Sequence, residues 1–476
     1  MDASAVDSAS LVRALARALP AEVIETHISW VLLLPQMAYK IKKPLRLPFL
    51  DYSTPQLRRH FCEEEVRLNR RFAPSLYLGV SRVTGTPAQP ALDGAGPVLD
   101  YAVRMRRFPD GSLFSERVAA GTLGAADIDR LAQMLGASHA SAPATRDAAG
   151  TVALSGRTLQ ALDGCAAVLP PEERAALRDW IASAGGEVDA LWQARRADGH
   201  ARECHGDLHL ANLVEVAGEV AAFDCIEFDA GLRCIDVVED VAFTHMDLAA
   251  RGLPAFAARF INGWLEWTGE YQGLPGLRLC LVYRALVRAM AEHLRGAAAA
   301  AGHYAAQALA WSRPTAPRLA ITHGLPGSGK TWRSQRWLEA HGGIRIRSDV
   351  ERKRLFGLDR LADSRASGVE IYTGEATRRT YQRLFTLARI ALQAGWPVVL
   401  DAAFLRIEER QVARDLAGAL GVAFSILDCE APLDVLRERL AQRRGDASEA
   451  DATVLERLAC TVEPLQPQEQ ALRIAE

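Results

Sequence analysis

Apolar runs rich in β-branched and aromatic side chains alternate with polar turns in the first part of the chain and predict β-strands. Such runs lie at residues 27–34, 38–42 and 99–108. Between the second and third runs, residues 54–72 repeat apolar side chains at the helical period and predict an amphipathic helix. Helical patterns then dominate most of residues 119–311. Strands followed by helices predict an α+β domain.

The pattern changes near residue 313, where Pro314 and Pro317 interrupt the helices and predict a short stiff linker. Beyond the linker, short apolar strands alternate with helical stretches, which predicts a parallel α/β sheet. The predicted strands lie at 319–322, 344–347, 397–400 and 424–427. We therefore expect two domains, at residues 1–313 and 318–476.

The sequence His-Gly-Asp-Leu-His-Leu-Ala-Asn at residues 205–212 has the spacing H-x-D-x-x-x-x-N of a phosphotransferase catalytic loop. A hydroxyl that accepts a phosphoryl group needs a carboxylate to take its proton, and Asp207 offers one. Asn212 and Asp224, which ends the apolar run 220–223, offer oxygen ligands for Mg²⁺. Such residues also stabilise turns that have no chemistry, but here three roles fit at one spacing.

This segment resembles the aminoglycoside phosphotransferase family, in which H-G-D-x-x-x-x-N precedes a strand that ends in Asp. The resemblance implies an α+β protein-kinase-like fold for the N-terminal domain. It implies that Asp207 is the catalytic base and that Asn212 and Asp224 are Mg²⁺ ligands. It also implies that Asp236 or Asp240 braces the catalytic loop, with capping of the following helix as the alternative role.

The kinase-like fold further implies a strand lysine that binds the α- and β-phosphates of ATP. Lys40 stands in Ala-Tyr-Lys, which resembles the Ala-x-Lys of kinases, and is the first choice; Lys42 on the same face is the second. Glu64 lies four residues before Leu68 on the apolar face of the next helix, so it is the expected partner of this lysine. The alternative is an edge strand with solvated lysines.

Gly-Leu-Pro-Gly-Ser-Gly-Lys-Thr at residues 324–331 matches G-x-x-x-x-G-K-[ST] and lies between a predicted strand and a predicted helix. Backbone N–H groups of such a loop surround phosphates, Lys330 contacts the β- and γ-phosphates, and Thr331 binds Mg²⁺. Asp349 and Asp401 each follow a predicted strand, where ligand chemistry gathers. The predicted nucleotide-binding residues are Gly324, Gly327, Ser328, Gly329, Lys330 and Thr331.

Together with Ser348-Asp349 and the arginines at 437–444, this loop resembles the zeta-toxin, polynucleotide-kinase and gluconate-kinase-like group. The resemblance implies an α/β P-loop NTPase fold for the C-terminal domain, with Asp349 facing the acceptor and Asp401 contacting metal or water. For Asp349, capping of the following helix is the alternative role. The resemblance also implies a lid arginine, expected at Arg443 or Arg444, for which an exposed charge is the alternative. The whole chain resembles bacterial fusions of an aminoglycoside-phosphotransferase-like domain with a P-loop kinase domain.

The composition, with 49% hydrophobic and 24% charged residues, is that of an ordinary soluble protein. A net charge of −2 over 476 residues argues against a dedicated binder of polyanions. The 8 cysteines include no C-x-x-C pair, which indicates reduced thiols rather than disulfides or a zinc site. The sequence shows no signal peptide and no apolar run of membrane-spanning length, so we expect a cytoplasmic protein with no membrane partner.

The expected function is that of an ATP-dependent phosphotransferase with two nucleotide sites, each using Mg²⁺ and transferring the γ-phosphate to a small-molecule hydroxyl. In one alternative, one domain binds nucleotide without turnover and regulates the other. In a second, the C-terminal domain is a nucleic-acid 5′-end kinase. The basic residues that allow this second alternative are Arg345, Arg347, Arg352, Lys353 and Arg354. Because no aromatic residue is interleaved with them to stack bases, a nucleic-acid partner is not favoured.

Overall fold

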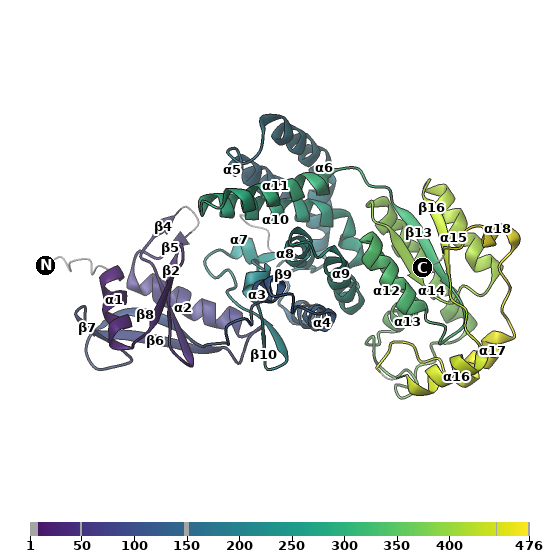
Figure 1. Ribbon diagram of the computed structural model, residues 1–476, viewed down its shortest axis with the longest axis horizontal. Helices are drawn as coiled ribbons and strands as arrows, with labels where there is room; N and C mark the ends of the chain where they lie inside the picture. Colours follow the sequence, from purple (N-terminus) through teal and green to yellow (C-terminus); the bar gives the residue numbers. More distant parts are fainter. Residues whose placement is uncertain (1–7, 48–49, 147–151, 444, 475–476) are drawn as a thin grey trace. The chain divides into compact units, whose positions relative to one another are not determined.

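The computed structural model describes residues 8–47, 50–146, 152–443 and 445–474 (Figure 1). The chain divides into two compact units, which are Met1–Val152 with Ala194–Thr244 (unit 1) and Ala153–Gln193 with His245–Glu476 (unit 2). The division lies elsewhere than the expected boundary at residues 314–317, because helices before that boundary pack with the parallel sheet after it. The domain limits along the chain therefore stay a prediction.

Unit 1 contains a six-stranded antiparallel sheet of order β1-β2-β3-β8-β6-β7. Its elements are α1 (Ser8–Ala18), β1 (Glu22–Glu25), β2 (Ser29–Leu33), β3 (Met37–Lys42), α2 (Pro55–Asn69), β6 (Tyr77–Thr86), β7 (Gln89–Leu92) and β8 (Val98–Arg106). The predicted strands at 27–34, 38–42 and 99–108 correspond to β2, β3 and β8. Strands β6 and β7 were not predicted, because glycines and a proline interrupt their apolar pattern.

Alternation along β3 sends neighbouring side chains to opposite faces of this sheet. Ile41 packs in a core with α1 on one face, whereas Val103 of β8 packs in a core with α2 on the other. Lys40 and Lys42 flank Ile41, so both lysines lie on the face that α2 covers. Helix α2 begins after Thr54, whose hydroxyl accepts the backbone N–H of Leu57, as expected for an N-cap.

The rest of unit 1 consists of short strands and helices that frame residues 204–233. Strand β9 pairs with β12, and β10 pairs with β11 as a hairpin. These elements are β4 (Arg46–Leu47), β5 (Leu50–Asp51), α3 (Phe114–Ala119), α4 (Ala125–Ser141), β9 (Ala201–Glu203), η1 (Leu210–Asn212), β10 (Leu213–Val216), β11 (Glu219–Ala222), α7 (Ala230–Arg233), β12 (Cys234–Asp236) and the first part of α8 (Val237–Ala250), a helix in which unit 1 ends at Thr244.

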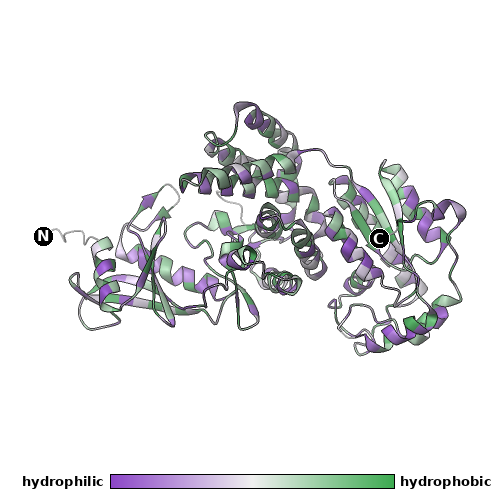
Figure 2. Cartoon of the chain, in the orientation of Figure 1, coloured by the Kyte–Doolittle hydropathy of each residue, from purple (hydrophilic) through white to green (hydrophobic). Residues whose placement is uncertain are grey.

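Unit 2 begins with helices, among which α10 packs against α5 and α11. They are α5 (Leu154–Gly164), α6 (Pro171–Ala197), α9 (Pro254–Thr268), η2 (Glu270–Gly273), α10 (Leu274–Leu294) and α11 (Ala298–Ser312). Hydrophobic and hydrophilic residues alternate along these helices, as expected for helices with one buried face (Figure 2). Within the described residues, none of the helices is long and apolar enough to cross a membrane.

A four-stranded parallel sheet of order β14-β15-β13-β16 completes unit 2, and the predicted parallel α/β sheet is confirmed. Its elements are β13 (Arg318–His323), α12 (Lys330–His341), β14 (Ile344–Arg347), α13 (Ser348–Leu355), α14 (Gly374–Gln393), β15 (Val398–Asp401), α15 (Ile407–Ala419), β16 (Ala423–Asp428), α16 (Leu433–Gln442), α17 (Ala452–Ala459) and α18 (Pro467–Gln470). Ala258 of α9 shares a core with Trp337 of α12 and Val399 of β15. Helix α9 therefore covers this sheet, beside α12 (Figure 1).

Candidate active sites

Two lysines of β3 meet one carboxylate from α2 in unit 1. Lys40 Nζ donates to Glu65 Oε1 at 3.0 Å, and Lys42 Nζ donates to Glu65 Oε2 at 2.6 Å. Burial alone raises the pKa of a carboxyl, but the two ammonium groups outweigh this effect and lower the pKa of Glu65. Each oxygen of this fully buried carboxylate therefore holds one lysine in place.

The expected partner of the phosphate lysine, Glu64, is corrected to its neighbour Glu65. Glu64 instead accepts a hydrogen bond from Arg67 at 2.8 Å near the surface. Adjacent residues on a helix point about 100° apart, so only one of the two glutamates faces the sheet. Glu65 lies three residues before the buried Leu68, and Glu64 lies four residues before it. Both spacings place two residues on the same face of a helix, so the spacing alone does not distinguish the two glutamates.

The surroundings of the two lysines differ. Lys40 also forms an ion pair with Asp224, whose side chain is 44% exposed. Lys42 is 1% exposed and pairs with the buried Glu227, beside the Tyr52 hydroxyl. Burial lowers the pKa of Lys40, yet Asp224 and Glu65 outweigh it and raise that pKa well above its usual value. Of the two lysines, Lys40 is thus the one that reaches an accessible candidate metal ligand.

Asp224 follows β11 in a left-handed backbone conformation, with φ of 64°. Residues with a Cβ atom adopt this conformation rarely and at a cost, so it needs support from its surroundings. The Asp224 N–H donates to Tyr77 Oη at 3.1 Å, and the N–H of Cys225 donates to Asn69 Oδ1 at 3.0 Å. These bonds tie the turn to β6 and α2 and bring the Asp224 carboxylate to Lys40.

The loop at residues 205–212 places Asp207 against Asn212. Asn212 Nδ2 donates to the Asp207 carboxylate and to its backbone carbonyl, in both cases at 3.0 Å. The Asp207 side chain is 36% exposed. The side-chain nitrogen of Asn212 is bound to Asp207, so the side-chain oxygen of Asn212, Oδ1, is the atom that could bind a metal ion.

His205 connects this loop to the turn that carries Asp224. Its Nε2 atom lies 2.9 Å from the Phe223 carbonyl oxygen, and its Nδ1 atom accepts the Asp207 N–H at 3.2 Å. An Nδ1 atom that accepts requires the proton on Nε2, and burial lowers the pKa of His205, which favours this neutral ring. The imidazole thereby ties the backbone of Asp207 to Phe223, the residue before Asp224.

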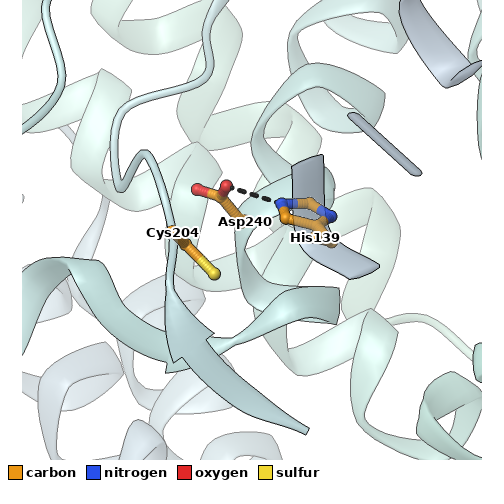
Figure 3. Close-up of side chains that lie close together, drawn as sticks. All are labelled: His139, Cys204 and Asp240. Atoms are coloured by element: carbon orange, nitrogen blue, oxygen red, sulfur yellow. Dashed lines mark hydrogen bonds and ion pairs between the residues drawn. The ribbon is translucent and has the colours of Figure 1, made fainter. Parts of the chain in front are cut away.

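Asp240 of α8, rather than Asp236, braces the loop. Its carboxylate accepts the Gly206 N–H at 2.8 Å and the His205 N–H at 3.1 Å. Its Oδ2 atom also lies 3.1 Å from Nε2 of His139, a residue of α4 (Figure 3). Asp236 instead accepts a hydrogen bond from Arg195 at 2.7 Å.

His139, Cys204 and Asp240 lie close enough together to hold a metal ion (Figure 3). The Asp240 carboxylate is already engaged by the loop and by His139. Burial raises the pKa of the Cys204 thiol well above its usual value, so the thiol keeps its proton, and it lies 3.6 Å from the Ile235 carbonyl oxygen. Because the Asp240 carboxylate accepts the N–H groups of His205 and Gly206, we interpret this cluster as a hydrogen-bonded support of the loop.

The glycine-rich loop before α12 uses backbone conformations that favour glycine. Gly324, Gly327 and Gly329 have φ of 142°, 82° and 93°. A Cβ atom at Gly324 would lie 2.2 Å from the Cys429 carbonyl oxygen, closer than real Cβ atoms approach. Ser328, which the motif places between the last two glycines, is 8% exposed. The motif glycines thus permit a tight turn that aims at the start of α12.

Lys330 at the start of α12 bends back over this loop. Its Nζ atom donates to the carbonyl oxygens of Gly324 at 2.9 Å and Leu325 at 2.8 Å. Burial lowers the pKa of Lys330, which has no direct carboxylate partner among the described residues. The lysine is therefore held by neutral dipoles, at the place where the motif positions phosphates.

The loop opens on a cavity of about 740 Å³ in unit 2. The predicted site residues that line this cavity are Gly327, Gly329, Lys330, Thr331, Asp349, Asp401 and Arg443. Asp401 ends β15, and its Oδ2 atom accepts the Ser334 hydroxyl at 3.1 Å. The structure thus brings together residues from the loop, from two strand ends and from the segment after α16.

Arginines gather around this cavity, but not only the expected ones. Arg443 Nε lies 3.9 Å from Asp446 Oδ2, and Arg444 lies outside the described residues. Arg347, which sequence reasoning did not select for the site, donates to Asp446 Oδ1 at 2.7 Å and lies 3.6 Å from Asp401 Oδ2. Its position as the last residue of β14, next to Ser348-Asp349, is the signal that could have found it.

The basic run at 345–354 does not form the exposed basic surface that the nucleic-acid alternative requires. Its members Arg345, Arg347, Arg352 and Lys353 are at most 7% exposed. Two of these arginines pair with Glu266 of α9, and Lys353 pairs with Glu449 at 2.9 Å. Arg345, Arg347 and Lys353 therefore have carboxylate partners inside unit 2, whereas Arg352 donates to the Ile371 carbonyl oxygen and lines the cavity.

Two family patterns match the segments that carry these sites. The phosphotransferase enzyme family matches residues 56–280, and the AAA domain matches residues 319–465. The chain is therefore a kinase, in which an aminoglycoside-phosphotransferase-like domain is joined to a P-loop kinase-like domain. Kinase and P-loop families use ATP, usually with Mg²⁺.

The chain belongs to the same family as uncharacterized proteins of Mycobacterium bovis and Mycobacterium tuberculosis. The relative from Mycobacterium tuberculosis strain H37Rv is 30% identical over 463 residues, which cover 92% of this chain and 89% of the relative. The relative from Mycobacterium bovis matches to the same extent. The resemblance thus extends across both family segments.

Solved structures resemble each segment separately. A choline/ethanolamine kinase family protein from Mesorhizobium loti is 13% identical, with 65% of this chain and 99% of that chain covered and a TM-score of 0.38. Aminoglycoside 2'-phosphotransferase-IIIa is 12% identical, with 65% and 98% covered and a TM-score of 0.37. A gluconokinase from Sinorhizobium meliloti 1021 is 19% identical, with 34% and 83% covered and a TM-score of 0.26.

Proposed function

We propose that this kinase has two ATP sites, each of which transfers the γ-phosphate to a hydroxyl of a small molecule. The observation that carries the proposal is two side-chain contacts in unit 1, of Lys40 with Asp224 and of Asn212 with Asp207, which join residues from three segments of the chain. Lys40 comes from β3, Asp207 and Asn212 from the loop before β10, and Asp224 from the turn after β11. Each offers the group that phosphoryl transfer requires of it.

In the unit 1 site, Lys40 binds the α- and β-phosphates while Glu65 holds its ammonium group. Asn212 Oδ1 and Asp224 hold Mg²⁺, which neutralises charge on the phosphates when bound. Asp207 accepts a hydrogen bond from the acceptor hydroxyl and takes its proton as the oxygen attacks. Asn212 Nδ2 keeps the Asp207 carboxylate in position for that hydroxyl. Lys42 is the buried support of this arrangement.

In the unit 2 site, the backbone N–H groups of the glycine-rich loop surround the phosphates, and Lys330 moves from the loop carbonyls to the β- and γ-phosphates. Thr331 and Asp401 hold Mg²⁺, and Asp349 receives the proton of the acceptor hydroxyl. Arg443, which also lines the cavity, binds the phosphates as a lid residue. Arg444 shares this proposed lid role by its place in the sequence.

Two features of unit 2 support a small acceptor rather than a nucleic acid. The cavity of about 740 Å³ falls in the usual range for small-molecule sites, roughly 300 to 1,000 Å³. In the basic run beside it, Arg345, Arg347 and Lys353 are buried and paired with carboxylates, so the run offers no exposed track for several backbone phosphates.

A screen for phosphorylated products tests the two-site proposal. A pool of metabolites is incubated with ATP and Mg²⁺, and products that gain one phosphate are identified by mass. Four proteins are compared: the wild type, Asp207→Asn, Lys330→Ala and the double variant. We expect each single variant to lose a different product by about 10²- to 10⁴-fold and the double variant to lose both.

The same four proteins discriminate the regulatory alternative. Binding of an ATP analogue by calorimetry checks that Asp207→Asn still binds nucleotide at both sites, since only the proton acceptor has changed. If one single substitution removes every product while the other removes none, only one site transfers phosphate and the two-site proposal is wrong. Product formation by the double variant would exclude both assigned sites.

A further inference from the structure

A buried ion network in unit 2 is centred on Glu266 of α9, a helix that lies within the phosphotransferase family match. The Glu266 side chain is 3% exposed. Its Oε1 atom accepts two hydrogen bonds from Arg345, at 2.7 and 3.1 Å, and its Oε2 atom lies 3.4 Å from Arg347 and from Arg360. One carboxylate thus faces three guanidinium groups from the P-loop part of the chain.

The network continues from Glu266 into the P-loop site. Arg345 also donates to the backbone carbonyl of Thr331 at 3.3 Å. Arg347 donates to Asp446 at 2.7 Å and lies 3.6 Å from the Asp401 carboxylate. Arg345 therefore contacts both Glu266 and Thr331, and Arg347 contacts both Glu266 and Asp401. Thr331 and Asp401 are the residues of the proposed metal site.

Helix α9 is fixed to β14 by more than this carboxylate. One turn before Glu266, Asn262 Oδ1 accepts the Arg345 N–H at 2.6 Å, and its Nδ2 atom donates to the Gly343 carbonyl at 2.8 Å. The Glu266 carbonyl accepts a hydrogen bond from Arg354 at 2.7 Å. A rigid helix therefore presents Glu266 to the arginines, as a positioning role requires.

We propose that Glu266 is a positioning residue of the P-loop site, where it holds Arg347 so that Asp401 remains able to bind Mg²⁺. The inference rests on the proposed function, which assigns Mg²⁺ to Thr331 and Asp401. Arg347 carries one positive charge and faces three carboxylates, on Glu266, Asp401 and Asp446. Without the charge on Glu266, the guanidinium group of Arg347 is attracted more strongly to Asp401 and Asp446. Arg347 then competes with Mg²⁺ for the Asp401 carboxylate.

The proposed role requires Glu266 to keep its negative charge at physiological pH. Burial alone raises the pKa of Glu266, but Arg345, Arg347 and Arg360 outweigh it and hold this pKa at about 2. The carboxylate is thus charged at every physiological pH. The kinase-like segment supplies a permanent negative charge that the P-loop segment uses.

The test measures the Mg²⁺ dependence of nucleotide binding in the full-length chain. The probe is AMPPNP, a non-hydrolysable ATP analogue, and the binding that Lys330→Ala removes is assigned to the P-loop site. In the parent and in Glu266→Gln, Mg²⁺ is titrated at a fixed concentration of the probe. We expect Glu266→Gln to raise the Mg²⁺ concentration for half-saturation by about fivefold to twentyfold, with affinity recovered at high Mg²⁺.

Two further variants separate positioning from a general loss of structure. Glu266→Asp keeps the charge with a shorter side chain and should recover part of the Mg²⁺ dependence. Glu339→Gln is the matched control, because Glu339 on α12 pairs with Arg259 of α9 at 3.0 Å and does not line the site. It should leave the half-saturation unchanged.

Each outcome decides between defined conclusions. If Glu266→Gln lowers only the amount of competent protein and leaves the Mg²⁺ half-saturation unchanged, Glu266 is structural and the inference is wrong. An equal shift in Glu339→Gln would also overturn it, because any weakening of the α9 contact would then suffice. If the parent shows no Lys330-dependent binding, the proposed P-loop function itself fails.

Discussion

The two candidate sites hold the lysines that we propose bind phosphate, Lys40 and Lys330, in opposite ways. Lys40 in unit 1 is paired with the carboxylates of Glu65 and Asp224, and these raise its pKa well above the usual value. Lys330 in unit 2 is held by two backbone carbonyls, and burial lowers its pKa. The positive charge of Lys40 is thus compensated by carboxylate side chains. The positive charge of Lys330 has neutral carbonyl partners, and a bound anion such as phosphate would compensate it fully.

This difference follows from how each site is assembled. The unit 1 site joins β3, α2 and two loops that lie far apart in the sequence, so its residues must be fixed to one another by ion pairs and hydrogen bonds. The P-loop site begins with eight consecutive residues, at 324–331, whose backbone conformation places the phosphate-binding groups. Contacts between side chains hold the unit 1 site together, whereas the backbone conformation of one loop forms the P-loop site.

The largest expected effect is a contrast in stability between Lys40→Met and Lys330→Met. Lys40→Met leaves Glu65 with one cation fewer in a buried site, so we expect unit 1 to lose about 3 to 5 kcal/mol of unfolding free energy. Lys330→Met removes a cation that burial disfavours, so unit 2 should lose little or gain slightly. Thermal unfolding of the full-length chain measures both, as a shift of roughly 10 °C for Lys40→Met.

Nucleotide binding provides the control for this contrast. Both variants should lose binding of an ATP analogue at their own site, which shows that each lysine belongs to a site whatever its effect on stability. Equal destabilisation by the two substitutions would contradict the comparison, because Lys330 would then have a stabilising partner that the loop carbonyls do not explain.

Substitution of two adjacent glutamates sharpens the assignment of the unit 1 partner. Glu65→Gln removes the charge that two buried lysines share, and we expect a loss of about 2 to 3 kcal/mol together with weaker ATP binding. Glu64→Gln removes an exposed ion pair with Arg67 and should cost at most about 1 kcal/mol. Chemical unfolding and calorimetry report the two effects. If Glu64→Gln lowers the unfolding free energy and ATP binding more than Glu65→Gln does, Glu64 is the partner of the lysine, as the sequence predicted.

How much the sequence predicts depends on whether a feature is local. The glycine-rich loop and the H-x-D-x-x-x-x-N loop are contiguous, and they indicated both kinase classes and the order of the domains. The four parallel strands were also predictable, because β13 and β15 are short, mostly apolar runs that are buried on both faces, and isoleucine alternates with arginine in β14. The choice between Glu64 and Glu65 was not, because helix periodicity defines a face only within about one residue.

Long-range partners were beyond prediction for a related reason. Asp240 remained one of two choices for bracing the loop, since the pattern around it fits a helix cap as well. The network of Glu266, Arg345 and Arg347 joins residues about 80 positions apart, and no local pattern marks such a pair. Arginines that read as an exposed basic run were buried by a helix that the sequence assigned to the other domain.

The smallest expected effect is a difference in pH dependence between the two lysines. The pKa of Lys330 lies below the usual 10.5 in the folded protein, so the unfolded chain binds more protons as the pH rises toward 10.5, and folding becomes more favourable over that range. The melting temperature of the wild type relative to Lys330→Met should therefore rise as the pH approaches 10.5 from below and then level off. Lys40 has a raised pKa, so its stabilisation is complete below 10.5 and is lost only above it. The wild type relative to Lys40→Met should thus show no change in the same interval.

Tyrosines and cysteines also titrate in this pH range, but they are common to the wild type and both variants and cancel in the differences. A constant gap for Lys330→Met would mean that an acidic partner already compensates Lys330, and the two sites would then hold their lysines alike.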